Sequence, residues 1–422
     1  MNFANKTEIA ITGMGLVSAL GSDPVLYYEQ MKSGASPIQA IELPGLGSEN
    51  RIWCAPVCNV QLPSWFNERL LDGTDVVSQW ALAAADKAVL QSGIQLDPLR
   101  TAVVAGTSLC GVQSVMRAQH AIDCLGPESF PRKTMLKALT NMAAAQICMH
   151  YELHGPNLTV TTACASTLDA LGTAARMIQS DLCDTAIAGA TEAGEMLESG
   201  GMDGSFVPSM AYAPASFGMQ SPVDEARLAS MPFDIKRSGV VGSEGSAFFV
   251  LERADLARAR GTKIFGLLSG YASLADAHHP SAPEPSGKWE ARTMQLALEN
   301  AGIEPDSIDA LIAHGTATPK GDSAEIRAIN SVHKRSGKAL PVTSTKGHFG
   351  HAAAASGGMS LIAGLMGMDD STFIHTANTD EPDPEARFDI VINNPRDLEI
   401  RHLQINAFGF GGQNASIVVS QA

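Results

Sequence analysis

Short apolar runs alternate along the chain with longer, Ala-rich stretches. The runs Ile9–Thr12, Ala102–Ala105, Leu158–Thr161 and Ala186–Ala188 contain no charged residue, as expected of buried strands covered on both faces of a sheet. In the stretch Ser166–Ser180, apolar positions recur at helical spacing. Because alternating strands and helices are typical of parallel α/β architecture, the pattern predicts an α/β fold.

The same succession of segments occurs twice. The similar pairs are Glu8–Gly15 with Lys263–Gly270, Thr101–Thr107 with Asp309–Thr316, and Val160–Ser166 with Val342–His348. Three matches in the same order indicate a duplicated chain. We predict two similar halves, residues 1–258 and 259–422, which pack face to face and bring equivalent turns to one site.

The charge of the chain argues against one class of partner. The 422 residues include 44 acidic and 29 basic side chains, for a net charge of −15. A nucleic-acid-binding domain usually carries a basic face that neutralises phosphates. We therefore expect no nucleic-acid partner.

Location and metal binding can also be addressed from the sequence. The N-terminus lacks the basic and apolar segments of a signal peptide, and the uncharged run 352–368 is at the short limit for a membrane span. We predict a cytoplasmic protein with no membrane span, in which 352–368 is a buried helix. The seven cysteines include no CxxC pair, so we expect free thiols and no metal site.

Cys164 is a candidate nucleophile. It lies between the predicted strand 158–162 and the helix 166–180, close to a helix N-terminus whose unpaired amides and dipole stabilise a thiolate. The turn can also expose the sulfur to a cleft. The spacing equally allows a small buried cysteine, which is the commoner fate of this residue.

His314 follows an apolar strand at its carboxyl end, where open α/β sheets place ligands. Gly315 permits close backbone approach, and Thr316 and Thr318 offer hydroxyls on one side of an extended segment. A structural histidine is the alternative, so position supports a functional role here and residue type does not.

Lys346, His348 and His351 crowd the start of an uncharged helix. Burying such groups costs free energy unless they are paired or used, which favours a functional cluster over a structural one. A metal site is conceivable, but this run contains no carboxylate.

The segment 406–415 places several glycines around two phenylalanines. Such a turn can present backbone amides to an oxyanion. An ordinary Gly-rich hairpin is the alternative.

Taken together, these runs resemble the β-ketoacyl-acyl carrier protein synthases. The resemblance extends over nearly the whole chain and is carried by the ordered motifs Gly155–Ser166, Pro232–Asp234, His314–Asp322, Ser344–His351 and Phe408–Ala415. It implies a thiolase-like fold, a five-layered α-β-α-β-α arrangement of two similar halves that is usually dimeric. It also implies an acyltransferase that forms C–C bonds by decarboxylative Claisen condensation in fatty acid or polyketide elongation.

The resemblance implies a role for each candidate residue. Cys164 would carry the acyl chain, while His314 and His351 would bind the malonyl thioester and stabilise the enolate. Lys346 would hold the histidines electrostatically, and the family spacing leaves His348 as an extra. The other implied roles are Asp322 and Glu325 as supporting residues, the amides of Cys164 and Phe408 as oxyanion hole with Phe408 as a gate, Thr316 and Thr318 as phosphopantetheine ligands, and Leu109, Cys110 and Phe410 as substrate-binding residues.

The resemblance also implies partners. No cofactor is expected beyond the phosphopantetheine of an acyl carrier protein, which we predict docks on Arg132, Lys133 and Lys137 (the alternative is a solvated helix face). We expect a homodimer, or a heterodimer with a chain-length-factor-like subunit.

Two other functions remain as alternatives. A dedicated polyketide or polyene ketosynthase is left open because the chain departs from the usual family pattern at Ser108, Cys110, Ser238–Val240 and Gln413. A cysteine acyl-thioester hydrolase would use Cys164 and a histidine without malonyl dependence. A thiolase would need a second cysteine near the C-terminal turn, and none follows Cys183.

Overall fold

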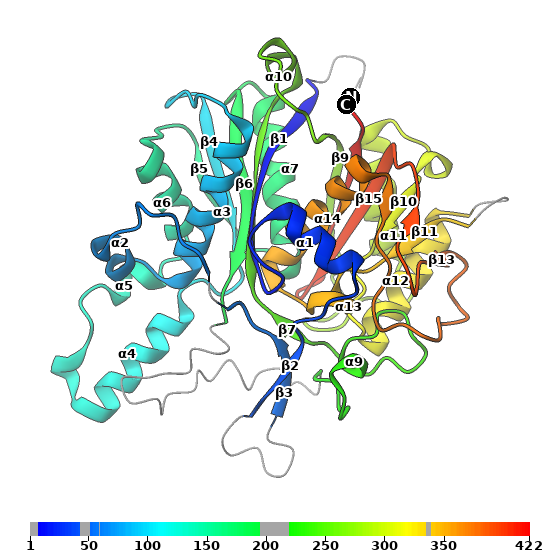
Figure 1. Cartoon of the computed structure of the whole chain (residues 1–422), viewed down its shortest axis with the longest axis horizontal. Helices are drawn as coiled ribbons and strands as arrows, with labels where there is room; N and C mark the ends of the chain where they lie inside the picture. The colour runs from blue at the N-terminus through cyan, green and yellow to red at the C-terminus, as the bar shows by residue number, and fades with distance from the viewer. Residues whose placement is uncertain (1–6, 43–50, 59, 195–218, 335–338) are drawn as a thin grey trace.

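The computed structural model describes residues 7–42, 51–58, 60–194, 219–334 and 339–422, and a mixed sheet runs through them (Figure 1). From its centre outward, the first half of the chain contributes β1 (Ile9–Ser18), β8 (Gly245–Arg253), β6 (Thr185–Glu192), β4 (Thr101–Gly106) and β5 (Asn157–Val160). The second half contributes β9 (Gly266–Ala275), β16 (Gln413–Ser420), β15 (His402–Gly409), β10 (Ala310–Ile312), β11 (Pro341–Thr343) and β13 (Asp389–Ile390).

The two halves of the sheet repeat one another. In each, the two innermost pairings are antiparallel and the next two are parallel. The halves join where Ala10 and Ile11 of β1 pair with Leu267 and Gly266 of β9. The similar segments of the sequence lie on β1 and β9, β4 and β10, and β5 and β11, so the predicted duplication is confirmed. The predicted boundary between residues 258 and 259 lies within α10 (Ala254–Ala259) and remains a prediction.

Helices complete a five-layer arrangement, as predicted. Between the two halves of the sheet lie α7 (Ser166–Gln179) and α14 (Ser356–Asp370), and the outer faces are covered by α3 (Val76–Ser92) with α6 (Met142–Tyr151) and by α11 (Lys288–Ala301) with α12 (Pro319–Val332) (Figure 1). Among the described residues, the remaining α-helices are α1 (Pro24–Lys32), α2 (Glu68–Gly73), α4 (Val112–Leu125), α5 (Thr134–Ala138), α9 (Ala226–Ala229) and α13 (Lys346–Phe349). A small three-stranded sheet consists of β2 (Gln39–Glu42), β3 (Arg51–Ala55) and β7 (Gly242–Ser243), and β12 (Thr372–Phe373) pairs with β14 (Arg396–Asp397).

Small residues allow the layers to approach closely. A Cβ on Gly13 of β1 would lie 2.0 Å from the carbonyl oxygen of Ala88, and one on Gly15 would lie 1.9 Å from that of Ala84. The helix α3 therefore rests directly on the backbone of β1. The abundance of Gly and Ala in the sequence is explained by contacts of this kind.

One predicted strand differs from its prediction. Residues 158–160 of the run Leu158–Thr161 lie in β5, but β5 is the edge strand of the sheet and Leu158 is 44% exposed. The prediction of a buried strand is wrong because, in the described chain, β4 pairs with one side of β5 and no strand pairs with the other. Residues 356–368 of the run 352–368 do lie in a buried helix, α14, and no helix within the described ranges is long and apolar enough to cross a membrane.

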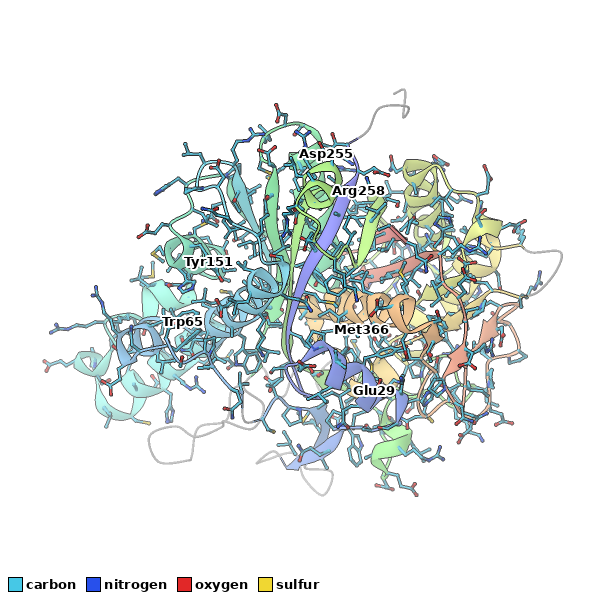
Figure 2. All side chains as sticks on the ribbon, turned by 45° about the horizontal axis from the view of Figure 1, so that its top comes forward. Glu29, Trp65, Tyr151, Asp255, Arg258 and Met366 are labelled. Carbon is cyan, nitrogen blue, oxygen red and sulfur yellow. The ribbon has the colours of Figure 1, made fainter. Side chains whose placement is uncertain are left out.

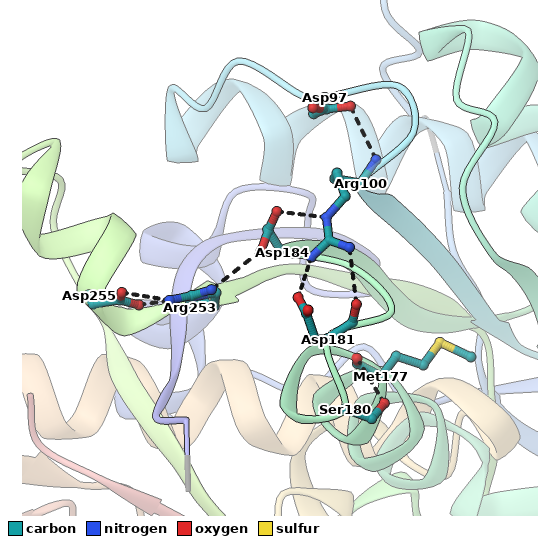
Figure 3. A network of polar contacts seen from close by, with 8 residues as sticks. All are labelled: Asp97, Arg100, Met177, Ser180, Asp181, Asp184, Arg253 and Asp255. Atoms are coloured by element: carbon teal, nitrogen blue, oxygen red, sulfur yellow. Dashed lines mark hydrogen bonds and ion pairs between the residues drawn. The ribbon is translucent and has the colours of Figure 1, made fainter. Parts of the chain in front are cut away.

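Polar networks bind the elements at the surface. Arg100, before β4, donates to Asp184 at 2.9 Å and to Asp181 at 2.5 Å, and Arg253 pairs with Asp255 at 2.9 Å (Figure 3). These contacts lie where β4 and β6 begin, and exposed pairs of this kind contribute about 0–1 kcal/mol each.

An aromatic cluster fixes α6 to its neighbours (Figure 2). The ring of Trp65 stacks on His150 at 3.9 Å, and the Tyr151 hydroxyl donates to Asp86 of α3 at 2.7 Å. The cluster lies on α6, which precedes β5, whereas Cys164 follows that strand.

Candidate active site

The turn that carries Cys164 is strained and tightly covered. After β5, a 3₁₀ turn (Ala163–Ala165) leads into α7, and Ala163 adopts a left-handed backbone with φ +49°. The β15–β16 hairpin presses on this turn: a Cβ on Gly409 would lie 2.9 Å from the Thr162 carbonyl oxygen and 3.0 Å from the Cys164 nitrogen. Strained backbone of this kind clusters at active sites, and only glycine permits so close an approach of the two backbones.

The two halves of the chain meet at Cys164. Its Sγ lies 3.0 Å from Nε2 of His351, and Sγ and a ring nitrogen of each of His314 and His351 all lie within 4.8 Å of one another. The two imidazole rings are edge to face, with centroids 5.2 Å apart. The structure therefore brings together the thiol and the two histidines that the sequence singled out.

Lys346 supplies a buried positive charge to this cluster. Its side chain is 2% exposed, and Nζ donates to the backbone carbonyl of His314 at 2.5 Å. Burial lowers the pKa of Lys346, whereas the carboxylates Glu325 and Asp322 oppose that shift. An ammonium group held here acts on both histidines and on Cys164.

Two buried carboxylates hold the backbone that carries His314. Glu325 accepts the amides of His314 and Gly315 at 2.8 and 2.7 Å, and Asp322 accepts the amide of Thr316 at 2.9 Å. Burial raises the pKa of both carboxyl groups, that of Asp322 to about 6. The position of these residues fits the predicted supporting role.

The hydroxyls of Thr316 and Thr318 lie 2.9 Å apart on the same side of the segment.

The electrostatics favour neutral imidazoles and a thiol that needs activation. Burial and then the charge of Lys346 hold the pKa of both His314 and His351 well below the usual value. Burial raises the pKa of Cys164 to about 11, while Lys346 and the amides of Phe410 and Cys164 lower it. At neutral pH each histidine therefore offers one N–H donor, and these surrounding donors stabilise a thiolate once it forms.

The glycine-rich segment is a hairpin that also presents amides. Gly411 and Gly412 adopt left-handed conformations between β15 and β16. The amide that reaches the sulfur of Cys164 belongs to Phe410, whose side chain is 43% exposed. The ring of Phe408 lies 5.9 Å from that of His314. The oxyanion and gate roles of Phe408 remain predictions.

The loop 107–111 lies near the cluster and is held by a residue that the sequence reasoning missed. Glu192, at the end of β6, accepts the amides of Ser108 and Leu109 at 2.8 and 3.2 Å, and its charge raises the pKa of Cys164. Leu109 is 47% exposed, whereas Cys110 is buried with φ +47°. The substrate-binding roles of Leu109 and Cys110 remain predictions.

His348 lies apart from this cluster. Its Nε2 donates to the carbonyl of His375 at 2.9 Å, and the two rings lie 4.9 Å apart. Burial lowers the pKa of His348 to about 4. The family spacing that selects His351 therefore agrees with the geometry.

The predicted docking residues lie around the start of α5. Arg132 is exposed, Lys133 pairs with Asp72 at 2.7 Å, and Lys137 lies in the last turn of α5. Their role in binding a carrier protein remains a prediction.

A cysteine with two histidines within 4.8 Å is also a set that zinc accepts. The buried ammonium of Lys346, which lowers the pKa of both histidines, would repel such an ion. The arrangement suits a nucleophile with two hydrogen-bond donors better than a metal centre.

Ser356 is a second residue that the sequence reasoning missed. Its hydroxyl lies 2.7 Å from Nδ1 of His351. A signal was present, because Ala163–Ser166 and Ala353–Ser356 both read as small residues ending in serine before a helix.

Comparisons with known proteins show which family this chain resembles. The model described as "Beta-ketoacyl synthase, N-terminal domain" matches residues 6–257, and "Beta-ketoacyl synthase, C-terminal domain" matches residues 265–380. A Staphylococcus aureus protein named 3-oxoacyl-[acyl-carrier-protein] synthase 2 is 32% identical over 98% of both chains. A Coxiella burnetii protein of the same name is 31% identical over 99% of both.

Two solved structures are similar over 99% of this chain and 100% of theirs. One is a type II PKS acyl-carrier protein in complex with its ketosynthase bound to the hexaketide, with a TM-score of 0.89 and 26% identity. The other is the ishigamide ketosynthase/chain length factor, with a TM-score of 0.88 and 27% identity.

Proposed function

The chain belongs to the β-ketoacyl synthase family, and on that premise we propose that it condenses an acyl group on Cys164 with malonyl-acyl carrier protein. The reaction is a decarboxylative Claisen condensation, and the enzyme is an acyltransferase that forms a C–C bond. The observation that carries the proposal is the Cys164 sulfur 3.0 Å from His351, with His314 completing the cluster. The fold is thiolase-like, with one half supplying the nucleophile and the other the donors.

The first step loads the enzyme. The Cys164 thiolate attacks the thioester carbonyl of an acyl carrier, and the carrier thiolate leaves and takes up the proton that Cys164 lost. Lys346 and the amides of Phe410 and Cys164 favour the thiolate, because each lowers the pKa of Cys164. Forming an acyl-enzyme first splits one difficult step into two easier ones.

The second step forms the new bond. The N–H groups of His314 and His351 donate to the malonyl thioester carbonyl, carbon dioxide leaves, and the electron pair remains as an enolate. The enolate attacks the acyl group on Cys164 and releases its thiolate. Preorganised donors in a site with little water stabilise such developing charge, and removing one typically costs roughly 10²–10³ in rate.

Other groups bind the rest of the substrate. Thr316 and Thr318 lie beside His314 and offer hydroxyls to the phosphopantetheine arm. The hairpin residues Phe408 and Phe410 lie over the cluster, where an amide can receive the thioester oxygen. The chemistry needs no further cofactor.

An acyl carrier protein and a second subunit are the partners that we propose. The edge strand β5 leaves a row of backbone groups unpaired within the described chain, and such edges readily pair with another chain. Exposed apolar residues are Leu158 on β5 and, within the segment 109–139, Leu109, Phe130, Met135, Leu136 and Leu139. Exposed apolar patches mark interfaces. The titles of the two similar structures name an acyl-carrier protein and a chain length factor for those proteins, which supports both kinds of partner here.

The test is mass spectrometry of the protein with a panel of acyl carriers, with and without malonyl carrier. An acyl adduct on Cys164 that becomes a carrier-bound β-ketoacyl product is the expected result. Release of the adduct only as free acid would contradict condensation and favour the hydrolase. A preference for saturated acyl chains over polyketide or polyene chains would distinguish fatty acid synthesis from a specialised pathway.

A further inference from the structure

We propose that Ser356 positions His351 for the second step. Its hydroxyl donates a hydrogen bond to Nδ1 of His351 and holds the ring in the tautomer that carries the proton on Nε2, beside Cys164. The inference rests on the proposed condensation and names a residue that determines which proton the site presents to the malonyl thioester.

The three groups lie in one line of contacts. Ser356 Oγ is 2.7 Å from Nδ1 of His351, and Nε2 of the same ring is 3.0 Å from Sγ of Cys164. Ser356 is 1% exposed and begins α14. Because water has little access to this hydroxyl, the ring nitrogen satisfies a group that would be costly to leave without a partner.

The equivalent serine of the first half makes different bonds. The Ser166 hydroxyl donates to the Ala163 carbonyl at 2.7 Å and accepts the Thr162 amide at 3.0 Å, so it stabilises its own turn. Ser356 occupies the same place at the head of α14, but its hydroxyl bonds to the side chain of His351. The turn itself therefore does not require the Ser356–His351 contact.

The tautomer of His351 follows from the role of its ring as a hydrogen-bond donor. A neutral imidazole has one donor and one acceptor nitrogen, and the partner of one nitrogen determines the role of the other. His351 must donate from Nε2 to an oxygen that becomes negative, so Nδ1 must accept. The hydroxyl of Ser356 supplies the donor. Nδ1 of His314 has no hydrogen-bond partner in the described chain, so of these two rings His351 is the one with an assigned partner at Nδ1.

The neighbouring charges do not compete with this bond. Lys346 and His314 face the ring of His351, and Glu192 acts on Cys164 from the end of β6. Lys346 disfavours protonation of both nitrogens of His351 and keeps the ring neutral. The ring therefore carries a single N–H, and the tautomer decides whether that N–H points to Cys164.

The experiment separates the two steps in the full-length enzyme. In Ser356→Ala we expect carbon dioxide release from malonyl carrier by pre-acylated enzyme to fall about 10-fold, which corresponds to about 1.4 kcal/mol of activation free energy, because the hydrogen bond and the fixed tautomer are both lost. Acylation of Cys164, followed by mass spectrometry, should change less than about 3-fold. The loss should appear in kcat and not in the KM for malonyl carrier.

Two further variants control for structure. Ser356→Thr retains a hydroxyl and should recover most of the decarboxylation rate. Ser360→Ala, which removes another buried serine hydroxyl of α14 that meets Thr345 at 2.9 Å, should leave both steps near wild type.

Several outcomes would overturn the inference. Equal loss in both steps, or a lower melting temperature with unaltered step ratios, would assign Ser356 a structural role. A loss confined to acylation would mean that the ring donates to Ser356 and acts as a base on Cys164. Failure of the wild-type enzyme to condense at all would instead contradict the proposed function.

Discussion

Two turns of the molecule have nearly the same backbone and different chemistry. Ala163–Ala165 and Ala353–Ala355 are both 3₁₀ turns that lead into helices of the central layer, and Ala163 and Ala353 have φ +49° and +43°. The first turn carries Cys164 and the second carries Ala354 at the same place. The duplicated fold therefore provided two helix N-termini, and one of them holds the nucleophile.

The second turn contributes through its surroundings. His351 precedes it and Ser356 follows it; Ser356 contacts His351, and His351 reaches Cys164 across the boundary between the halves. The Thr167 hydroxyl donates to the Ala354 carbonyl at 2.5 Å, so the two turns are also bonded to each other. In such a site, one half of the chain forms the covalent intermediate and the other half stabilises the negative charge of the enolate.

Removing the thiol should have the largest effect. Cys164→Ala should abolish the acyl adduct and lower condensation by roughly 10³-fold or more, because the covalent path is lost. Adding Ala354→Cys to that variant should not restore an adduct, because Ala354 is fully buried. Intact-mass measurement with an acyl carrier checks both variants, and an adduct on the new cysteine would show that the turns are interchangeable.

Replacing each of the two histidines by alanine tests the contribution of the C-terminal half of the chain. His351→Ala should abolish condensation to within detection, a loss of at least roughly 10²–10³-fold, because it removes a donor to the enolate. His348→Ala should only weaken it, because His348 contacts His375 and not Cys164. Rates of β-ketoacyl product formation decide between them. Equal losses would mean that the assignment of His351 is wrong.

Lys346, in the C-terminal half, should control the pKa of Cys164 in the N-terminal half. Its charge lowers the pKa of Cys164, so Lys346→Ala should raise that pKa and slow alkylation of Cys164 near pH 8 by about 10-fold for each unit of pKa. Lys346→Arg, which retains the charge, should lose less. The pH dependence of iodoacetamide labelling of the Cys164 peptide provides the measurement, and identical profiles in all three proteins would contradict the coupling.

His348 should affect stability instead of the reaction. Its pKa is about 4 in the folded protein and about 6.5 when unfolded, so between these values the unfolded chain binds the extra proton. Stability is therefore lost as the pH falls from about 6.5 to 4, by up to about 1.4 kcal/mol per pH unit. The melting temperature of His348→Gln should fall less over this range than that of the wild type. Parallel curves would contradict a buried, neutral His348.

The smallest effect is expected at the surface, away from both turns. Charge reversal at Arg132, Lys133 and Lys137 should weaken carrier binding several-fold at low salt and much less at high salt. Arg258→Glu on α10 (Figure 2), which removes a surface pair with Glu8, is a matched control. Calorimetric titration with the carrier measures both. Unchanged affinity in the first variant would exclude this patch as the docking site.

Much of the fold was predictable because its strands and its duplication depend on local sequence patterns. Apolar runs without charge identified β1, β4 and β6, and repeated segments identified the duplication. The register of the third repeat was not predictable. The strands β5 and β11 correspond, but the short helix α13 follows β11, and the counterpart of α7 is α14. Sequence similarity therefore aligned Cys164 with Lys346, whereas the backbone structure aligns Cys164 with Ala354.

The sequence by itself determined the kinds of residue at the site: Cys164 at a strand-to-helix turn, His314 after a strand, and Lys346 with His351 at a buried helix. The tertiary structure decided which of them meet. It separated His348 from His351, brought the Phe410 amide to the sulfur, and paired Ser356 with His351. The reason is physical: strand and helix periods are local properties of the chain, whereas contacts across the two halves depend on how the layers pack.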